Sequence, residues 1–158
     1  MATQQDISSV LARLMALCSR REYCSSDILR KAMQALGGDR EAAVEVLDKL
    51  VREKYVDDLR YSSAYARDKA AIAGWGSAKI RYMLSSKGVA RDVIDMAMLE
   101  IDECKADCRL EKLVRAKYKA LENDAQMKMK LLRYVVGRGY PYEDASTIID
   151  RIIKESKI

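Results

Sequence analysis

Glycines recur about 50 residues apart along the chain, at Gly38, Gly88 and Gly139, and a similar apolar pattern follows each of them. The side chains six, nine and thirteen positions after each glycine are apolar, and these offsets place each trio on one helix face. A fixed period of this length indicates a tandem array of small helical units. The nine positions are Val44, Leu47 and Val51, then Ile94, Ala97 and Ile101, and finally Ala145, Ile148 and Ile152.

The segment before each glycine also repeats, and a further amphipathic segment precedes it in every unit. No alternating strand pattern competes, and Asp39 is placed to cap a helix. We therefore predict an all-α chain of nine helices in three tandem three-helix repeats, over residues 1–57, 58–103 and 104–158. A unit this small has a thin core, so stacking into an elongated, curved array is expected.

The composition favours a binding protein over an enzyme. The chain contains no His, the commonest general base and metal ligand, and only one Pro. It has no phosphate-binding P-loop, and the glycine pair at 137–139 follows a predicted helix rather than a strand. Its carboxylate pairs fall at helix ends, where capping is the ordinary explanation. We expect no catalytic site.

Basic residues are unevenly distributed in a chain of net charge +5. Residues 60–91 carry seven basic side chains and one acidic side chain. Residues 105–138 carry ten basic and four acidic side chains. Such clusters favour anionic partners, either nucleic acid or an acidic protein surface. Trp75, between two glycines, is a candidate for stacking on a base or for plugging a helix junction. The candidate binding residues are Arg60, Arg67, Trp75, Lys79, Arg81, Lys87, Arg91, Lys105, Arg109, Lys112, Arg115 and Lys119.

The four cysteines are Cys18, Cys24, Cys104 and Cys108. Their spacing does not match a zinc knuckle, and no His is present to complete a ligand set, so packing cysteines are expected. No leader peptide or membrane-spanning stretch is evident. We expect a cytoplasmic protein with reduced thiols that makes no membrane contact.

Residues 55–62, with the sequence YVDDLRYS, resemble the central signature of the RecX family of recombinase regulators. Tyr65 and Arg67 extend this resemblance, as do Gly74 and the segments 79–80 and 87–89. The first predicted repeat matches the family pattern at residues 21–22, 25 and 29–31. In the third predicted repeat only the helical pattern matches the family.

The resemblance implies tandem three-helix repeats that bind the RecA recombinase in the groove of its filament on single-stranded DNA. It implies inhibition of filament growth, ATP hydrolysis, strand exchange and co-protease activity, with no cofactor. Asp58 and Arg60 would begin the central helix, with Asp58 as its N-cap and Arg60 and Arg67 as contacts. A monomer is expected.

Two other functions remain open at this stage. The first is a helical DNA-binding protein that acts without a recombinase, which the charge distribution favours. However, no predicted repeat contains a polar recognition helix rich in Asn, Gln and Arg. The second is a helical scaffold whose partner is another protein.

Overall fold

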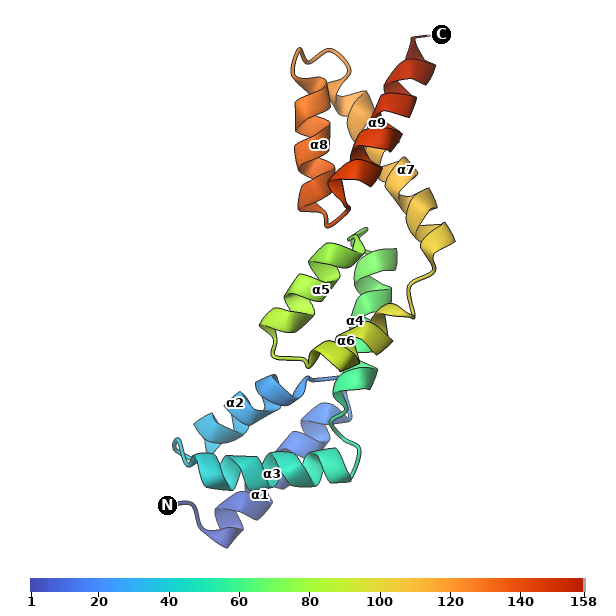
Figure 1. The fold of residues 1–158 in the computed structure, drawn as a ribbon. Coiled ribbons are helices and arrows are strands. Elements are labelled where there is room, and N and C mark those ends of the chain that lie inside the picture. The colour runs from blue at the N-terminus through green and yellow to red at the C-terminus, as the bar shows by residue number, and fades with distance from the viewer. Residues whose placement is uncertain (158) are drawn as a thin grey trace. The chain divides into compact units, whose positions relative to one another are not determined.

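The computed structural model describes residues 1–157, and at positions 103 and 104 the backbone alone. Over this range the chain forms nine helices and no strand, which confirms the all-α prediction (Figure 1). None of these helices is long and apolar enough to span a bilayer. The helices are α1 (Gln4–Cys18), α2 (Ser25–Ala35), α3 (Arg40–Arg52), α4 (Asp58–Ala71), α5 (Ser77–Ser86), α6 (Arg91–Met98), α7 (Glu103–Leu121), α8 (Met127–Gly137) and α9 (Tyr142–Ser156).

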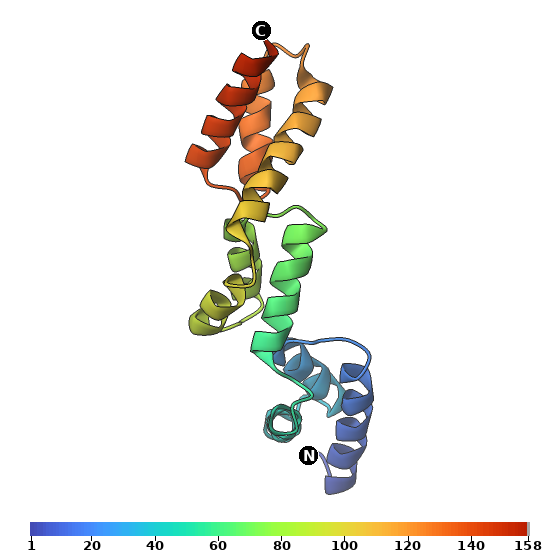
Figure 2. The ribbon, with the colours of Figure 1, turned by 90° about the vertical axis from the view of Figure 1, so that its right-hand side faces the viewer.

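The helices divide into two compact units. Unit 1 contains Met1–Ala64 and Leu84–Ala97, and unit 2 contains Tyr65–Met83 and Met98–Ile158. In unit 1, α1, α2 and α3 pack on one another, and in unit 2, α7, α8 and α9 do the same (Figures 1 and 2). Helices α4 and α5 contribute residues to both units. The division into three repeats stays a prediction.

A glycine with positive φ ends the middle helix of each predicted repeat. These glycines are Gly37, Gly88 and Gly139, with φ of 66°, 80° and 98°. In each case the next residue donates its backbone N–H to a carbonyl five residues earlier, at Met33, Leu84 and Val135. This is the Schellman arrangement, which needs a left-handed residue that glycine adopts without steric cost. The repeat is therefore set by Gly37 rather than by Gly38.

This register corrects the predicted core face of α3. Counted from Gly37, the trio becomes Ala43, Val46 and Leu50, and all three are fully buried. Val51 was predicted to lie in the core and is instead 46% exposed. The error arose because two successive glycines precede α3, and both have positive φ. In the later repeats the prediction is confirmed at four positions, where the side chains of Ile94, Ala97, Ala145 and Ile152 are buried.

Carboxylates cap the starts of α2, α3 and α4. Asp39 accepts a hydrogen bond of 3.1 Å from the Ala42 N–H, as predicted for the N-cap of α3. At the start of α4 the capping carboxylate is Asp57, which accepts from the Arg60 N–H at 3.0 Å. Asp58, the predicted N-cap of α4, instead accepts from the Ser25 N–H at 2.8 Å and so caps α2. The start of α4 is thereby fixed to the start of α2.

In unit 2, the α4–α5 loop meets the α8–α9 turn through backbone contacts. The Gly76 N–H donates to the Arg138 carbonyl at 2.7 Å, and the Ala78 N–H donates to the Gly139 carbonyl at 3.1 Å. The Tyr140 hydroxyl donates to the Gly74 carbonyl, also at 3.1 Å. These bonds satisfy loop groups and an N–H in the first turn of α5, which would otherwise lack partners.

This joint leaves no room for a side chain at Gly76. A Cβ there would lie 2.4 Å from the Gly139 carbonyl oxygen, which is far inside van der Waals contact with a backbone atom. A Cβ on Gly139 would likewise lie 2.4 Å from the Cβ of Lys79. The close approach explains why both positions are glycine.

We predict that Gly76→Ala lowers the free energy of unfolding by about 1–3 kcal/mol, the usual cost of overpacking. Gly137→Ala is the matched control, because nothing lies within 4 Å of a Cβ at that position in α8. The control is expected to be neutral or slightly stabilising, since alanine favours helix more than glycine does. Urea denaturation followed by circular dichroism measures both variants. Equal midpoints for the two would contradict the packing at the joint.

Candidate binding surfaces

The Arg60 side chain is engaged within unit 1. Its Nε donates to Glu22 Oε1 at 2.7 Å, and its Nη2 donates to the carbonyls of Lys54 and Tyr55 at 3.0 and 3.3 Å. The hydrogen bond that Arg60 donates to Glu22 raises the pKa of Arg60. Lys54 has a φ of 65°, a conformation that non-glycine residues rarely adopt, so Arg60 braces the turn between α3 and α4.

Lys87 is also engaged within unit 1. Its ammonium group lies 3.9 Å from Asp27 Oδ2, and its carbonyl accepts a hydrogen bond from the Ser26 hydroxyl. Ser26 and Asp27 lie in the first turn of α2, and Lys87 follows α5. Lys87, a candidate binding residue, therefore joins the start of α2 to the end of α5.

Trp75 lies among lysines and a tyrosine in unit 2. The ammonium groups of Lys69 and Lys79 lie 4.7 and 4.4 Å from its ring centroid. The Tyr65 ring meets the indole edge to face at 6.3 Å, and Lys69 also lies 5.5 Å from the Tyr65 ring centroid. We call these four residues the aromatic–lysine cluster.

The aromatic–lysine cluster combines two features that nucleic acids recognise. Its ring faces hold the ammonium groups by cation–π attraction, which leaves their N–H donors able to meet a phosphate. The indole is only partly buried, so a base could stack on it after a lysine moves aside. The two interpretations of Trp75 are therefore compatible, since it packs at a helix junction and is only partly buried.

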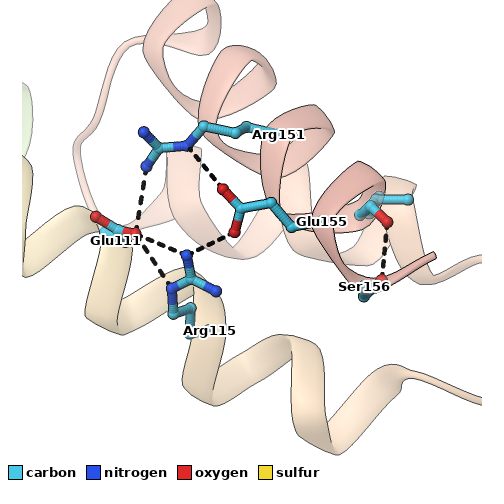
Figure 3. A network of polar contacts seen from close by, with 6 residues as sticks. Glu111, Arg115, Arg151, Glu155 and Ser156 are labelled. Carbon is cyan, nitrogen blue, oxygen red and sulfur yellow. Dashed lines mark hydrogen bonds and ion pairs between the residues drawn. The ribbon is translucent and has the colours of Figure 1, made fainter. Parts of the chain in front are cut away.

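Arg115 belongs to an ion-pair network between α7 and α9 (Figure 3). Its Nη2 lies 2.8 Å from Glu111 Oε1 and 2.9 Å from Glu155 Oε2. Arg151 closes the network, with contacts of 3.3 Å to Glu111 and 4.0 Å to Glu155. Glu155 and Glu111 raise the pKa of Arg115, and Arg115 in turn lowers the pKa of Glu111. The network stabilises the bundle rather than presenting a free cation.

Three lysines of α7 remain open to a partner. Lys105, Lys112 and Lys119 recur every seven residues, so they lie on one side of the helix, and all three are exposed. Within the described part of the chain, none of them takes part in an ion pair. We call them the lysine stripe. Arg109 differs, because it is half-buried and its Nε has no hydrogen-bond partner among the described residues.

Three further candidates, Arg67, Arg81 and Arg91, lie on α4, α5 and α6. Arg67 lies 3.5 Å from Glu100 in unit 2. Arg81 and Arg91 are exposed. Of the twelve candidates, Arg60, Lys87 and Arg91 belong to unit 1 and the others to unit 2.

The cysteines form no metal site in the described part of the chain. Across those residues, no three His, Cys, Asp or Glu side chains are placed to hold an ion. The Cys104 side chain lies outside the described residues. Cys24 is buried, Cys108 is exposed, and burial raises the pKa of Cys18.

Three residues that position these surfaces were not among the candidates predicted from the sequence. Lys69 follows Tyr65 by four positions, a helical spacing that could have revealed the pair. Glu22 holds Arg60 from 38 residues away, and no local pattern predicts such a contact. Arg138 donates to the Ala73 carbonyl at 3.1 Å from 65 residues away, and it was counted only as a charge.

Comparisons with known proteins agree on one family. The family model described as "RecX, second three-helix domain" matches residues 57–98. The regulatory protein RecX of Pseudomonas fluorescens is 32% identical over 136 residues, which cover 85% of this chain and 86% of the relative. A RecX of Clostridium botulinum is 33% identical, and the match covers 81% of this chain. This chain spans 59% of that protein's length and 55% of the Clostridium tetani relative.

Solved structures agree on the fold. A crystal structure of a regulatory protein RecX has a TM-score of 0.81 at 21% identity, covering 92% of this chain and 72% of its own. RecX from Lactobacillus salivarius has a TM-score of 0.79 at 18% identity, and the match covers 94% of this chain and 97% of the Lactobacillus chain. With the Pseudomonas relative matched over most of both lengths, the chain belongs to the RecX family of regulatory proteins.

Proposed function

We propose that this chain binds the RecA recombinase filament on single-stranded DNA and inhibits its growth. Reduced ATP hydrolysis, strand exchange and co-protease activity would follow from that binding. The observation that carries the proposal is the match to the Pseudomonas fluorescens regulatory protein RecX over 86% of that protein's length. Binding alone accounts for this role, so it requires neither catalysis nor a cofactor.

The distribution of charge supports a filament as the partner. Both units carry exposed cations, with Arg91 in unit 1 and the lysine stripe in unit 2. Contacts that are individually weak become strong together when they engage a repeating partner, because each later contact is intramolecular. A filament that contains DNA is also strongly anionic, so basic surfaces speed association with it.

The contacts within the chain narrow the choice of binding residues. Arg60, Lys87 and Arg115 have carboxylate or carbonyl partners in their own unit, and recruiting them would break those bonds. The lysine stripe and the aromatic–lysine cluster lose less on binding. We assign the filament contacts to these two groups and to Arg91.

We predict that the protein inhibits DNA-dependent ATP hydrolysis by its cognate RecA when present well below equimolar amounts. One regulator bound to a filament can affect many subunits, whereas sequestering free subunits requires one regulator for each. A coupled ATPase assay with increasing amounts of regulator measures the ratio. Full activity at an equimolar ratio and low salt would contradict a role on filaments.

A second prediction concerns the lysine stripe. Reversing Lys112 and Lys119 to Glu together should weaken filament binding about tenfold or more, because each change replaces an attraction by a repulsion. The measurement is fluorescence anisotropy on RecA filaments, with circular dichroism to verify the fold. The matched control reverses Arg133 and Lys154, exposed cations of α8 and α9, and has the same net charge. Equal losses in both double variants would remove α7 from the interface.

Direct DNA binding without a recombinase is the alternative, and the aromatic–lysine cluster favours it. Trp75 is the only tryptophan, so intrinsic tryptophan fluorescence reports on this cluster alone. If a base stacks on the indole, oligo(dT) should quench the emission at low salt, and added salt should reverse the effect. Lys69→Gln should weaken the quenching.

The same titration distinguishes the two functions. Quenching by oligo(dT) at concentrations far below those needed to inhibit RecA would favour the DNA-binding alternative. Unchanged emission with DNA alone, together with inhibition of RecA, would place the primary contact on the recombinase.

A further inference from the structure

A cleft of about 500 Å³ lies between α1 and α2 in unit 1. Its apolar lining consists of Leu14 and Leu17 with the small side chains of Ala16 and Ala35. Leu14 is buried, whereas both alanines are exposed, so the cleft has an aliphatic floor that opens to solvent. None of these residues was a candidate in the sequence.

The rim of the cleft is basic. Arg13, Arg20 and Lys31 line it with the amide of Gln34, and no lining residue is acidic. Among the described side chains, these three cations form no ion pair. The carboxylates nearest to Arg20 and Lys31 in the sequence are already engaged, because Glu22 holds Arg60 and Asp27 pairs with Arg30 and Lys87. The rim therefore keeps its positive charge.

An aromatic ring holds one of these cations in place. The Lys31 ammonium lies 5.6 Å from the Tyr23 ring centroid, and the Arg21 guanidinium lies 4.3 Å from it. Cation–π attraction orients a side chain without neutralising it, unlike a carboxylate. Lys31 is thus positioned at the cleft with its donors available to an anion.

We propose that this cleft binds an acidic peptide segment that inserts an aliphatic side chain. The unpaired cations of the rim complement carboxylates, and the aliphatic floor between two helices suits a Leu or Ile side chain. Single-stranded nucleic acid is a poorer fit, because it needs exposed aromatic faces for stacking. None of the described residues that line the cleft is aromatic, and Tyr23, whose ring lies near Lys31, is 8% exposed and already faces Arg21 and Lys31.

This cleft shares no residue with the surfaces assigned to the filament. None of its residues belongs to the lysine stripe or to the aromatic–lysine cluster, and its occupant can come from any protein with an acidic segment. The inference therefore does not rest on the role proposed with RecA. A protein that fails to inhibit RecA could still bind the peptide.

The test uses fluorescence anisotropy with the full chain and a labelled synthetic peptide rich in Glu and Asp that carries two Leu. A twin peptide in which both Leu are replaced by Ser tests whether the aliphatic floor contributes to binding. Oligo(dT) of equal charge tests whether the cleft binds nucleic acid instead. The Leu peptide is expected to bind several-fold more tightly than its twin and to resist displacement by oligo(dT). Equal binding of the two peptides, or tighter binding of oligo(dT) at the same residues, would overturn the proposal.

Variants locate the binding. The double variant Arg13→Gln with Arg20→Gln should weaken the Leu peptide about five- to tenfold, as expected for losing two partly exposed charge contacts. The control pair, Arg40→Gln with Arg52→Gln, removes two exposed cations of α3 in the same unit that do not line the cleft. Arg13 lies on α1 and Arg20 follows that helix, and both side chains are exposed, so folding should be retained. Equal weakening in the two double variants would mean non-specific attraction and would refute the site.

Discussion

The left-handed glycine after the middle helix of each predicted repeat is the constraint on which much of the fold depends. Gly37, Gly88 and Gly139 each reverse the chain within a few residues, so the next helix can return against the one just ended. An L-residue at this φ would be strained, and a longer loop would add entropy to a unit with little core. In unit 2 the last of these glycines has a second role, because its carbonyl accepts a hydrogen bond from the first turn of α5.

Helix content was predictable because it depends on local periodicity, which survives in any tertiary context. The register of the first predicted repeat was not predictable. Two successive glycines follow α2, and the sequence pattern does not show which of them ends the helix. That one-residue shift moved Val51 out of the core and Leu50 into it. The capping role of Asp58 was also missed, since its partner Ser25 lies 33 residues away.

The candidate site was harder to predict, because a sequence shows where charges lie but not how they are paired. Arg60 and Lys112 look alike in the sequence as exposed cations on predicted helices. In the structure Arg60 braces a turn through Glu22 and two carbonyls, whereas Lys112 is exposed and bears no such bonds among the described residues. Of the predicted residues, those with the strongest family resemblance are among the most engaged within the chain. Their contacts within the chain account for their presence in the signature.

The pairing of charges gives a physical criterion for where a basic protein meets its partners. A cation held by a carboxylate gains little from binding a new anion. The existing ion pair must break, and the freed carboxylate then repels the incoming anion. A cation held by an aromatic ring keeps its full charge and loses less conformational entropy on binding than a free lysine does. Lys31 beside Tyr23 and Lys69 beside Trp75 meet this second condition. They lie in different units, next to an aliphatic cleft and an indole ring respectively, so the two units are suited to anions of different chemistry.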